Sequence, residues 1–456
     1  MPGYAQSLLA RISVCLLTVV VTAGCNAYFT INDPTPLAEP TAGYRPGTRP
    51  SGERSEEVLL TLAFSGGGTR AAAFAYGVLA ELEDTRLIFD GRQRSLVDEV
   101  DVISGVSGGS FTAAYFGLHG RDTFNTFEKQ FLRRDVQGEL GMRLLAPWNW
   151  PRLFSPFYTR SDIAAEFYDE HIFDGAVFGD LAAGDGPAIQ IFATDMATGS
   201  PFAFNQDQFD FLCSDLLTYP IARAVTASSA VPGVFAPLTL RNFSGSCDFN
   251  PPAWVIEEAA GEYSFDRMYV NARNLESYLD SERRKYIRVV DGGISDNLAV
   301  RGPFEAWTLR PPRLGERPVS MGTLRTVVIV VVNAATTPEA AWEKVDSPPA
   351  LSMVLRDSTS AQIRRYNLET LEQLRAVLTT WNAVAQDWAD PVKFHLVEID
   401  FMKIRDPAER HYLNEQPTSF RLDSKGVDTL IEAGRQAVRG SAAFERAVTD
   451  ISGEDR

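Results

Sequence analysis

The chain of 456 residues carries a formal net charge of -16, and 45% of its residues are hydrophobic. This length allows one large domain or two to three ordinary ones, and the apolar share is enough for a sizeable core, so disorder is not expected. The acidic balance argues against nucleic acid as a partner and against electrostatic adhesion to anionic lipid, because both reward clustered Lys and Arg. Any contact with a membrane is therefore expected to be hydrophobic or covalent.

Residues 1–24 have the order of a secretory signal peptide. Arg11 precedes the apolar run 12–21, and small residues lead from there to Cys25. The apolar run is too short to span a bilayer comfortably, since a spanning helix needs about 20 residues. The ending Ala-Gly-Cys resembles the lipobox of bacterial lipoproteins, in which the cysteine is diacylated and becomes the first residue. Simple signal cleavage and an uncleaved anchor are the alternatives.

The segment that follows the cysteine predicts where the protein resides. By the same resemblance, Asn26 rather than Asp after Cys25 implies the outer membrane of a bacterial cell envelope. Two or three acyl chains would anchor the chain stably, because each buried CH₂ contributes about 0.8 kcal/mol. Prolines recur through residues 25–57 with little apolar periodicity, which predicts an extended tether. The folded domain is then expected over residues 58–450.

The cysteines of the folded part allow one disulfide. None of the four cysteines lies in a close pair of the kind that zinc sites use, so no structural metal is expected. An exported chain would meet an oxidising compartment, where Cys213 and Cys247 could be bridged. Two unrelated buried thiols are the alternative, because spacing alone does not fix connectivity.

From residue 58 onward, strands and helices are expected to alternate. Apolar runs typical of strands occur at 58–64, 100–104, 188–194, 286–290, 326–332 and 394–399. Nearly continuous Val and Ile runs of this kind predict an α/β fold of three layers, a central mainly parallel sheet with helices on both faces. Residues 122–174 and 241–285 do not fit the alternation and are interpreted as insertions. No linker separates a second domain.

The first strand runs into three glycines, Gly66, Gly67 and Gly68, and then into an amphipathic helix. Such a turn points backbone N–H groups at the space above the helix N-terminus, where something negative is expected to bind or form. In an acyl transfer that negative group is the oxyanion, and one such donor is worth roughly 3 kcal/mol. Arg70 is expected to hold the turn by bonding neighbouring carbonyls, with a solvated first-turn arginine as the alternative.

The second turn contains a candidate nucleophile. The sequence Gly105-Val106-Ser107-Gly108-Gly109 fits G-x-S-x-G, and it lies between a predicted strand and a predicted helix, as a nucleophile elbow requires. There the serine hydroxyl is exposed on a tight turn. A glycine-rich loop with an incidental serine is the alternative.

A serine hydroxyl needs a base to take its proton. Of the four histidines, His411 follows Ser107 and Asp291 in the order of an α/β-hydrolase triad, but nothing around it supports this role. His395 alternates with apolar residues on a predicted strand and is expected to be structural. The better partner is Asp291, which an apolar strand delivers to the end of the sheet beside two glycines. As the base it needs partial burial to raise a pKa that is ordinarily about 3.9, and a turn-capping aspartate is the alternative.

Three motifs occur in one order, and together they resemble the patatin-like phospholipases. They are Gly-Gly-Gly-Thr-Arg at 66–70, Gly-Val-Ser-Gly-Gly at 105–109 and Asp-Gly-Gly at 291–293, and the segments 193–199 and 227–236 are similar to the family as well. The resemblance covers about residues 58–333, and 334–450 is a less diagnostic extension.

The family implies a hydrolase that cleaves ester bonds of membrane lipids, such as phospholipids or lysophospholipids, through an acyl-serine. It implies Ser107 as nucleophile, Asp291 as base, the amides of the glycine turn as oxyanion hole, and neither a cofactor nor a metal. Two rival functions stay open. The glycine turn formally fits a nucleotide-binding fingerprint, although the next strand ends in Ser107 rather than in the acidic residue that holds a ribose. A catalytically silent envelope scaffold is the second rival.

Overall fold

The computed structural model describes residues 30–35, 41–48, 52–89, 91–155, 158–262, 266–302, 321–337, 339 and 341–453. The expected signal peptide, the acylation site Cys25 and parts of the tether lie outside these residues. Within them, no helix combines the length and the apolar character needed to cross a bilayer.

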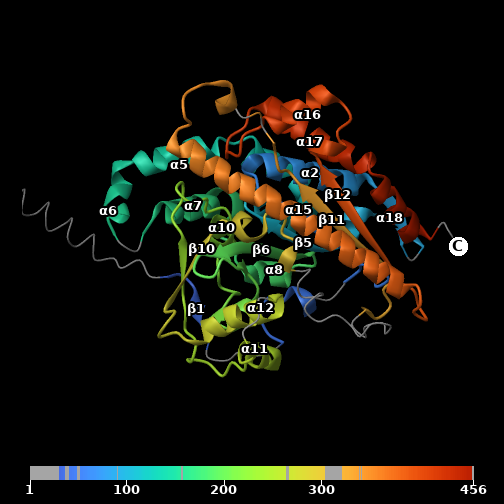
Figure 1. The fold of residues 1–456 in the computed structure, drawn as a ribbon, viewed down its shortest axis with the longest axis horizontal. Coiled ribbons are helices and arrows are strands. Elements are labelled where there is room, and N and C mark those ends of the chain that lie inside the picture. Colours follow the sequence, from blue (N-terminus) through green and yellow to red (C-terminus); the bar gives the residue numbers. More distant parts are fainter. Residues whose placement is uncertain are drawn as a thin grey trace, which may run out of the picture.

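A mostly parallel sheet forms the centre of the molecule (Figure 1). Its strand order is β12-β11-β2-β5-β6-β10-β9, with β7 paired to β6. The strands from β12 to β6 pair in parallel, whereas β10 pairs antiparallel with both β6 and β9. The bounds are β2 Val58–Phe64, β5 Val100–Val106, β6 Ala188–Asp195, β7 Pro201–Ala203, β9 Leu238–Arg241, β10 Tyr286–Val290, β11 Thr326–Asn333 and β12 Lys393–Asp400. The predicted α/β class with a mainly parallel sheet is confirmed.

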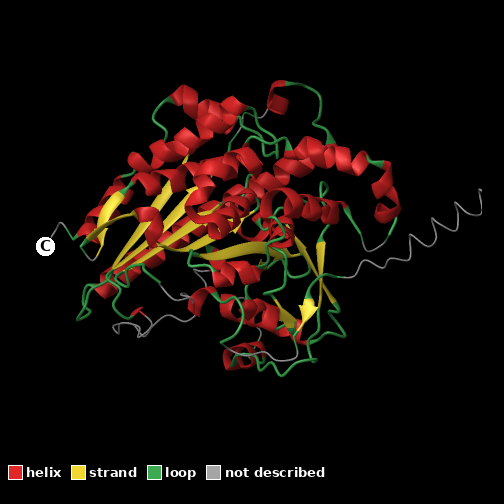
Figure 2. Ribbon diagram, turned by 180° about the vertical axis from the view of Figure 1, so that it is seen from behind, coloured by secondary structure: helices red, strands yellow, loops and turns green. Residues whose placement is uncertain are grey.

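Helices cover both faces of this sheet (Figures 1 and 2). Alternate residues of β11 show the division: Val328 and Val330 belong to the core under α2, α3 and α17, whereas Val327 and Val331 pack toward α15. Helices of these layers include α2 Gly68–Asp84, α3 Gly108–His119, α10 Ile221–Ser228, α15 Leu351–Ala385, α17 Ser424–Arg439 and α18 Ala442–Ser452. α17 packs along α2. The C-terminal extension therefore contributes α17 to the layer that begins at the glycine turn, and α15 to the opposite face.

The remaining elements of the described chain are as follows. They are the strands β1 Asp33–Pro34, β3 Arg86–Phe89, β4 Arg92–Ser95 and β8 Ser214–Asp215, and the helices α4 Thr123–Phe127, α5 Val136–Leu145, α6 Trp150–Leu153, α7 Arg160–Tyr168, α8 Phe178–Ala183, α9 Gln206–Asp210, α11 Ala253–Ala259, α12 Arg267–Glu276, α13 Gly293–Asp296 and α16 Pro407–Asn414. Single 3-10 or π turns lie at Pro46–Thr48, Leu96–Glu99, Gly120–Asp122, Glu128–Leu132, Pro147–Asn149, Asp169–Phe173, Ser277–Leu279, Ala341–Lys344 and Phe401–Lys403.

The aromatic insertion at 122–174 forms α4 to α7 and packs on α3 without adding a strand. Phe111 of α3 stacks on Phe131 with ring centroids 4.3 Å apart, and it meets Tyr168 edge to face at 4.9 Å. Both insertion residues are fully buried. The aromatic residues that break the strand and helix alternation are thus core residues of the layer that carries α3.

The two cysteines of the folded part are joined. Cys213 and Cys247 form a disulfide, with their Cα atoms 5.6 Å apart. The bridge joins the segment after α9 to the irregular stretch after β9. It therefore fixes the beginning of the second predicted insertion, 241–285, to the domain.

Candidate active site

Ser107 lies on a strained turn between β5 and α3. Its backbone has φ 50° and ψ -122°, a conformation that residues other than glycine rarely adopt. The Ser107 N–H donates to Ser228 Oγ at 2.8 Å, and the Ser107 carbonyl accepts from Ser110 Oγ at 2.6 Å. Two hydroxyl groups from neighbouring helices therefore hold the strained turn in place, as a nucleophile elbow requires.

The elbow touches the glycine turn directly. A Cβ atom on Gly108 would lie 2.0 Å from the carbonyl oxygen of Gly68, so no side chain fits between the two helix N-termini. The other two glycines of the motif are equally confined: a Cβ on Gly109 would meet the Phe64 carbonyl at 2.5 Å, and one on Gly105 would meet Ser110 Cα at 2.8 Å. Because the predicted elbow glycines have no side chains, Ser107 can lie directly beside the glycine turn 66–68.

Asp291 follows β10 and is 8% exposed. Its backbone is fixed on both sides, because its N–H donates to Ala230 O at 3.0 Å and its carbonyl accepts from Thr194 Oγ1 at 2.8 Å. Its carboxylate accepts from the Gly293 N–H at 2.7 Å, and the Ser107 side chain lies close enough to influence its pKa. Burial raises the pKa of Asp291 to about 6, and the Gly293 N–H and the neighbouring Ser107 side chain oppose the rise.

The glycine turn offers two free amides rather than three. The Gly66 N–H donates to Asn297 O at 3.0 Å, so it is not available to an oxyanion. In the described part of the chain, no carbonyl or side chain accepts from the N–H groups of Gly67 and Gly68. The expected oxyanion hole therefore narrows to Gly67 and Gly68, because the chain itself uses the first amide to tie the turn to the Asp291 loop.

Arg70 is buried beneath the turn, with 4% of its surface exposed. Its Nε donates to Ala334 O at 3.0 Å and its Nη1 donates to Gln416 O at 2.7 Å. Burial lowers its pKa to about 10. The arginine binds carbonyls, as expected, but these lie far along the chain, after β11 and after α16. Arg70 consequently joins the glycine turn to the C-terminal extension.

Several residues of the site were not singled out by the sequence. Ser419 lies over the glycine turn, where its carbonyl accepts from the Thr69 N–H at 2.9 Å. Ser228 and Thr194 support Ser107 and Asp291, as described above. Both lie in segments, 193–199 and 227–236, that resemble the family, so a role for them could have been sought there; no sequence signal marks Ser419.

The histidines lie elsewhere. His411 is exposed on α16, and His395 Nε2 lies 2.9 Å from Asp450 Oδ2. Among the described groups that shift the pKa of Asp291, none is a histidine. The structure therefore brings Ser107 and Asp291 together and leaves His411 on the surface of its helix.

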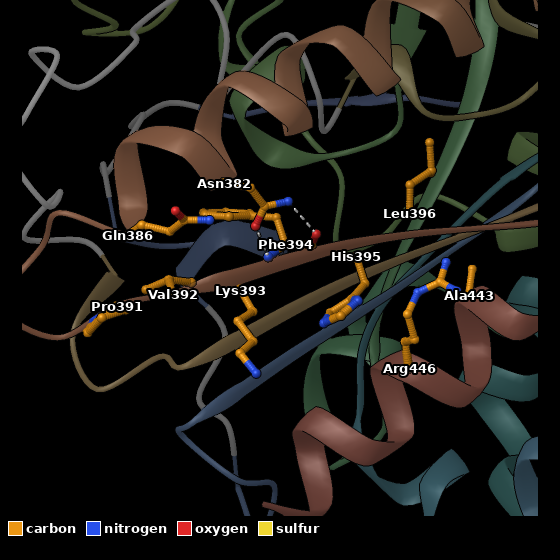
Figure 3. Close-up of a pocket in the computed structure, with 10 residues that line it drawn as sticks. All are labelled: Asn382, Gln386, Pro391, Val392, Lys393, Phe394, His395, Leu396, Ala443 and Arg446. Carbon is orange, nitrogen blue, oxygen red and sulfur yellow. Dashed lines mark hydrogen bonds between the residues drawn. The ribbon is translucent and has the colours of Figure 1, made fainter. Parts of the chain in front are cut away.

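A separate cavity of about 450 Å³ lies between α15, β12 and α18, where His395 and Arg446 line it (Figure 3). It contains neither Ser107 nor Asp291. Within the described ranges, no group of three His, Cys, Asp or Glu side chains is placed to hold a metal ion.

Residues 62–304 match the family model of patatin-like phospholipases. The chain belongs to the patatin-like phospholipase family. Its motif-bearing part, from the end of β2 to just beyond α13, is the part that matches. Arg70's two acceptors and Ser419 lie outside the matched residues.

Two solved structures resemble the chain more distantly. Human GIVD cytosolic phospholipase A2 is 13% identical with a TM-score of 0.45, over 87% of this chain and 63% of that one. VipD from Legionella pneumophila is 12% identical with a TM-score of 0.29, over 83% of this chain and 67% of that one. This chain thus spans less than two thirds of the human enzyme. No curated protein matches it in sequence.

Proposed function

We propose that the protein is a serine acyl hydrolase that cleaves lipid ester bonds with Ser107 as nucleophile and Asp291 as base. One observation carries the proposal: a buried carboxylate whose pKa is raised to about 6 lies beside the serine of a strained elbow, close enough for the serine side chain to influence that pKa. At neutral pH such a carboxylate is ionised and is a better proton acceptor than an ordinary aspartate. Membership of a phospholipase family supports the reaction class.

In the first half of the reaction, Ser107 Oγ attacks the ester carbonyl carbon as its proton passes to Asp291. The carbonyl oxygen becomes an oxyanion, and the free N–H groups of Gly67 and Gly68 are placed to stabilise it. The C–O bond to the alcohol then breaks, and the leaving oxygen takes the proton from Asp291. The products of this half are the free alcohol, such as a lysophospholipid, and an acyl ester on Ser107.

In the second half, water replaces the alcohol. Asp291 takes a proton from water as the hydroxide attacks the acyl carbon, and the same two amides receive the second oxyanion. Collapse of this intermediate returns the proton to Ser107 Oγ and releases a carboxylic acid. No group beyond the chain and water is needed for the balance of atoms and charges.

The surface around the dyad supports a lipid as substrate. Exposed apolar side chains follow three of the elements that lead to the site: Met196 follows β6, Val231 and Val234 follow α10, and Ile294 in α13 follows β10, all at least 36% exposed. Acyl chains are the natural partners of such side chains. We propose phospholipids or lysophospholipids as the substrate class.

The proposal is tested by incubating the full chain with mixed phospholipids and lysophospholipids and measuring released fatty acid. We expect release by the wild type and none by Ser107→Ala. A folded wild type that releases no fatty acid and does not react with an alkyl fluorophosphonate would instead support the silent scaffold. The nucleotide-binding alternative has no further support, because β5 runs into Ser107 and not into an acidic residue.

We also propose that Cys25 is acylated and anchors the enzyme in the bacterial outer membrane. The motive is the Ala-Gly-Cys ending of the apolar N-terminal segment. Mass spectrometry of the membrane fraction checks it: the wild type should carry the mass of attached acyl chains, and Cys25→Ala should lack it. If the Cys25→Ala chain still carried the added mass of the acyl chains, the proposal would be contradicted.

A further inference from the structure

The surface of the aromatic insertion carries a cluster of exposed apolar side chains. It comprises the end of α5, the turn Pro147–Asn149, α6 and the residue after it. Five large apolar side chains here are 49–85% exposed, and we call them the apolar tip: Met142, Leu145, Trp148, Trp150 and Phe154. Single exposed apolar residues are ordinary, but a cluster with two tryptophans within one short segment indicates a binding surface. The segment lies at the periphery of the molecule in both views (Figures 1 and 2).

The segment that carries the apolar tip has a defined conformation. Val136 and Leu140 anchor the inner side of α5 in the core. Asn149 is buried and its side chain donates to Arg143 O at 2.8 Å, which fixes the turn between α5 and α6. The apolar tip is therefore exposed on an ordered helix and turn. Its side chains could become buried within the same chain only if α5 and this turn were rearranged.

The charges around the apolar tip decide which partner it fits. Arg143 and Arg152, the two arginines within the segment, pair with Glu170 and Glu166 of the neighbouring α7 region. These ion pairs neutralise both arginines of the segment, and the whole chain has a formal net charge of -16. The segment therefore lacks the excess positive charge that would attract nucleic acid or an anionic membrane. Tryptophan beside aliphatic and phenyl side chains is typical of the boundary between head groups and acyl chains of a bilayer.

The apolar tip also connects to the candidate active site. At the start of α5, the Gln137 N–H donates to Phe420 O at 3.3 Å, and Ser419 Oγ donates to Gln137 Oε1 at 2.9 Å. Ser419 in turn holds the Thr69 N–H at 2.9 Å, next to Gly68. The helix that ends in the apolar tip thus begins on the segment that lies over the glycine turn.

We propose that the apolar tip inserts into the interfacial layer of a lipid bilayer with electrically neutral head groups and holds the Ser107 site at that surface. This rests on the proposed function, in which the substrate is a membrane lipid. Insertion is hydrophobic rather than electrostatic, so it is insensitive to salt and does not require anionic lipid. Cys25 would tether the chain, whereas the apolar tip orients the catalytic domain.

The first test measures insertion without catalysis. The full chain with Ser107→Ala is mixed with phosphatidylcholine vesicles brominated on their acyl chains, and tryptophan fluorescence is recorded. We expect bromine to quench the fluorescence, and the added substitutions Trp148→Leu and Trp150→Leu to remove at least half of the quenched signal. Quenching that is unchanged by these substitutions would overturn the proposal. So would quenching that needs phosphatidylglycerol and disappears at about 1 M salt, where the Debye length is only about 3 Å.

The second test compares activity on vesicles with activity on a soluble short-chain ester. We expect Trp148→Ser with Phe154→Ser to lower the ratio of these activities at least tenfold. The matched control is Ile88→Ser on β3, a residue 69% exposed on a hairpin that packs near α18; it should leave the ratio within twofold. The proposal would be contradicted by an unchanged ratio in the tip variant. It would also be contradicted if vesicles caused no quenching and the chain instead formed a concentration-dependent dimer that the tip variant abolished. If no ester is hydrolysed, the proposed function fails while the quenching test still decides insertion.

Discussion

Ser107 and Asp291 meet although the strands that carry them run in opposite directions. Val106 of β5 pairs in parallel with Phe192 of β6, so Ser107 comes level with the next residue of β6. Val290 of β10 pairs antiparallel with Thr194, so Asp291 comes level with the same residue from the other side. β10 overlaps only the carboxyl end of β6, and the carboxylate therefore reaches the serine at the edge where α/β sheets bind ligands.

The pH dependence of the reaction should report the buried carboxylate. Asp291 accepts a proton only when ionised, and burial raises its pKa to about 6. We expect kcat/KM for a soluble ester to fall about tenfold per pH unit below that value and to level off above it, because this ratio follows the free enzyme. Circular dichroism at each pH separates the effect from unfolding. A limb near pH 7 that disappears in His411→Ala would contradict the assignment.

Asp291→Asn should stabilise the fold at alkaline pH. The folded pKa, about 6, lies above the unfolded value, so ionisation of Asp291 disfavours the folded state. This penalty is nearly absent at about pH 3, below the unfolded pKa, and complete above about pH 7, where it is on the order of 3 kcal/mol. Urea denaturation should therefore show the variant more stable than wild type at about pH 8 and nearly equal to it at about pH 3. Equal stabilities at both pH values would show that burial does not strain this carboxylate.

Part of this site is predictable because it is encoded locally. The elbow needs only a strand, two glycines beside a serine and a helix, and all of these lie between residues 100 and 119. The direction in which each strand enters the sheet is not encoded locally. The run 286–290 suggests a strand and places Asp291 at its end, but an apolar pattern is the same in either direction, so the antiparallel entry of β10 was not predictable.

Long-range partners account for what the sequence left out. Arg70 was expected to bind neighbouring carbonyls, but it binds Ala334 and Gln416, which lie 264 and 346 residues away. The Gly66 amide was expected in the oxyanion hole, but Asn297 occupies it. Propensity and motif spacing describe neighbours along the chain and carry no information on such contacts.

Arg70→Met should weaken both the fold and catalysis. The substitution removes the arginine donor from one buried and one partly buried carbonyl oxygen, and a lost hydrogen bond of a charged group costs about 2 kcal/mol. The turn that presents Gly67 and Gly68 loses its brace, so we expect kcat to fall about 10- to 100-fold, in the range of a weakened oxyanion hole. Urea denaturation and steady-state kinetics measure the two effects.

The matched control for that variant is Arg86→Met, which removes an arginine that is half exposed on β3. It should change stability by less than about 0.5 kcal/mol, as surface substitutions do, and leave kcat at the wild-type value. An Arg70→Met enzyme with wild-type kcat would show that the glycine turn does not need the arginine.

We expect Ser107 and Asp291 to form the reactive pair without a histidine. The most direct measurement is the rate at which an alkyl fluorophosphonate adds covalently to the full chain, followed by intact mass. We expect one adduct on the wild type and on His395→Ala and His411→Ala at similar rates, no adduct on Ser107→Ala, and labelling at least about 10³-fold slower in Asp291→Asn, the scale on which serine enzymes lose activity without their base. A folded His411→Ala chain that fails to react, or an Asp291→Asn chain that reacts at the wild-type rate, would contradict the dyad.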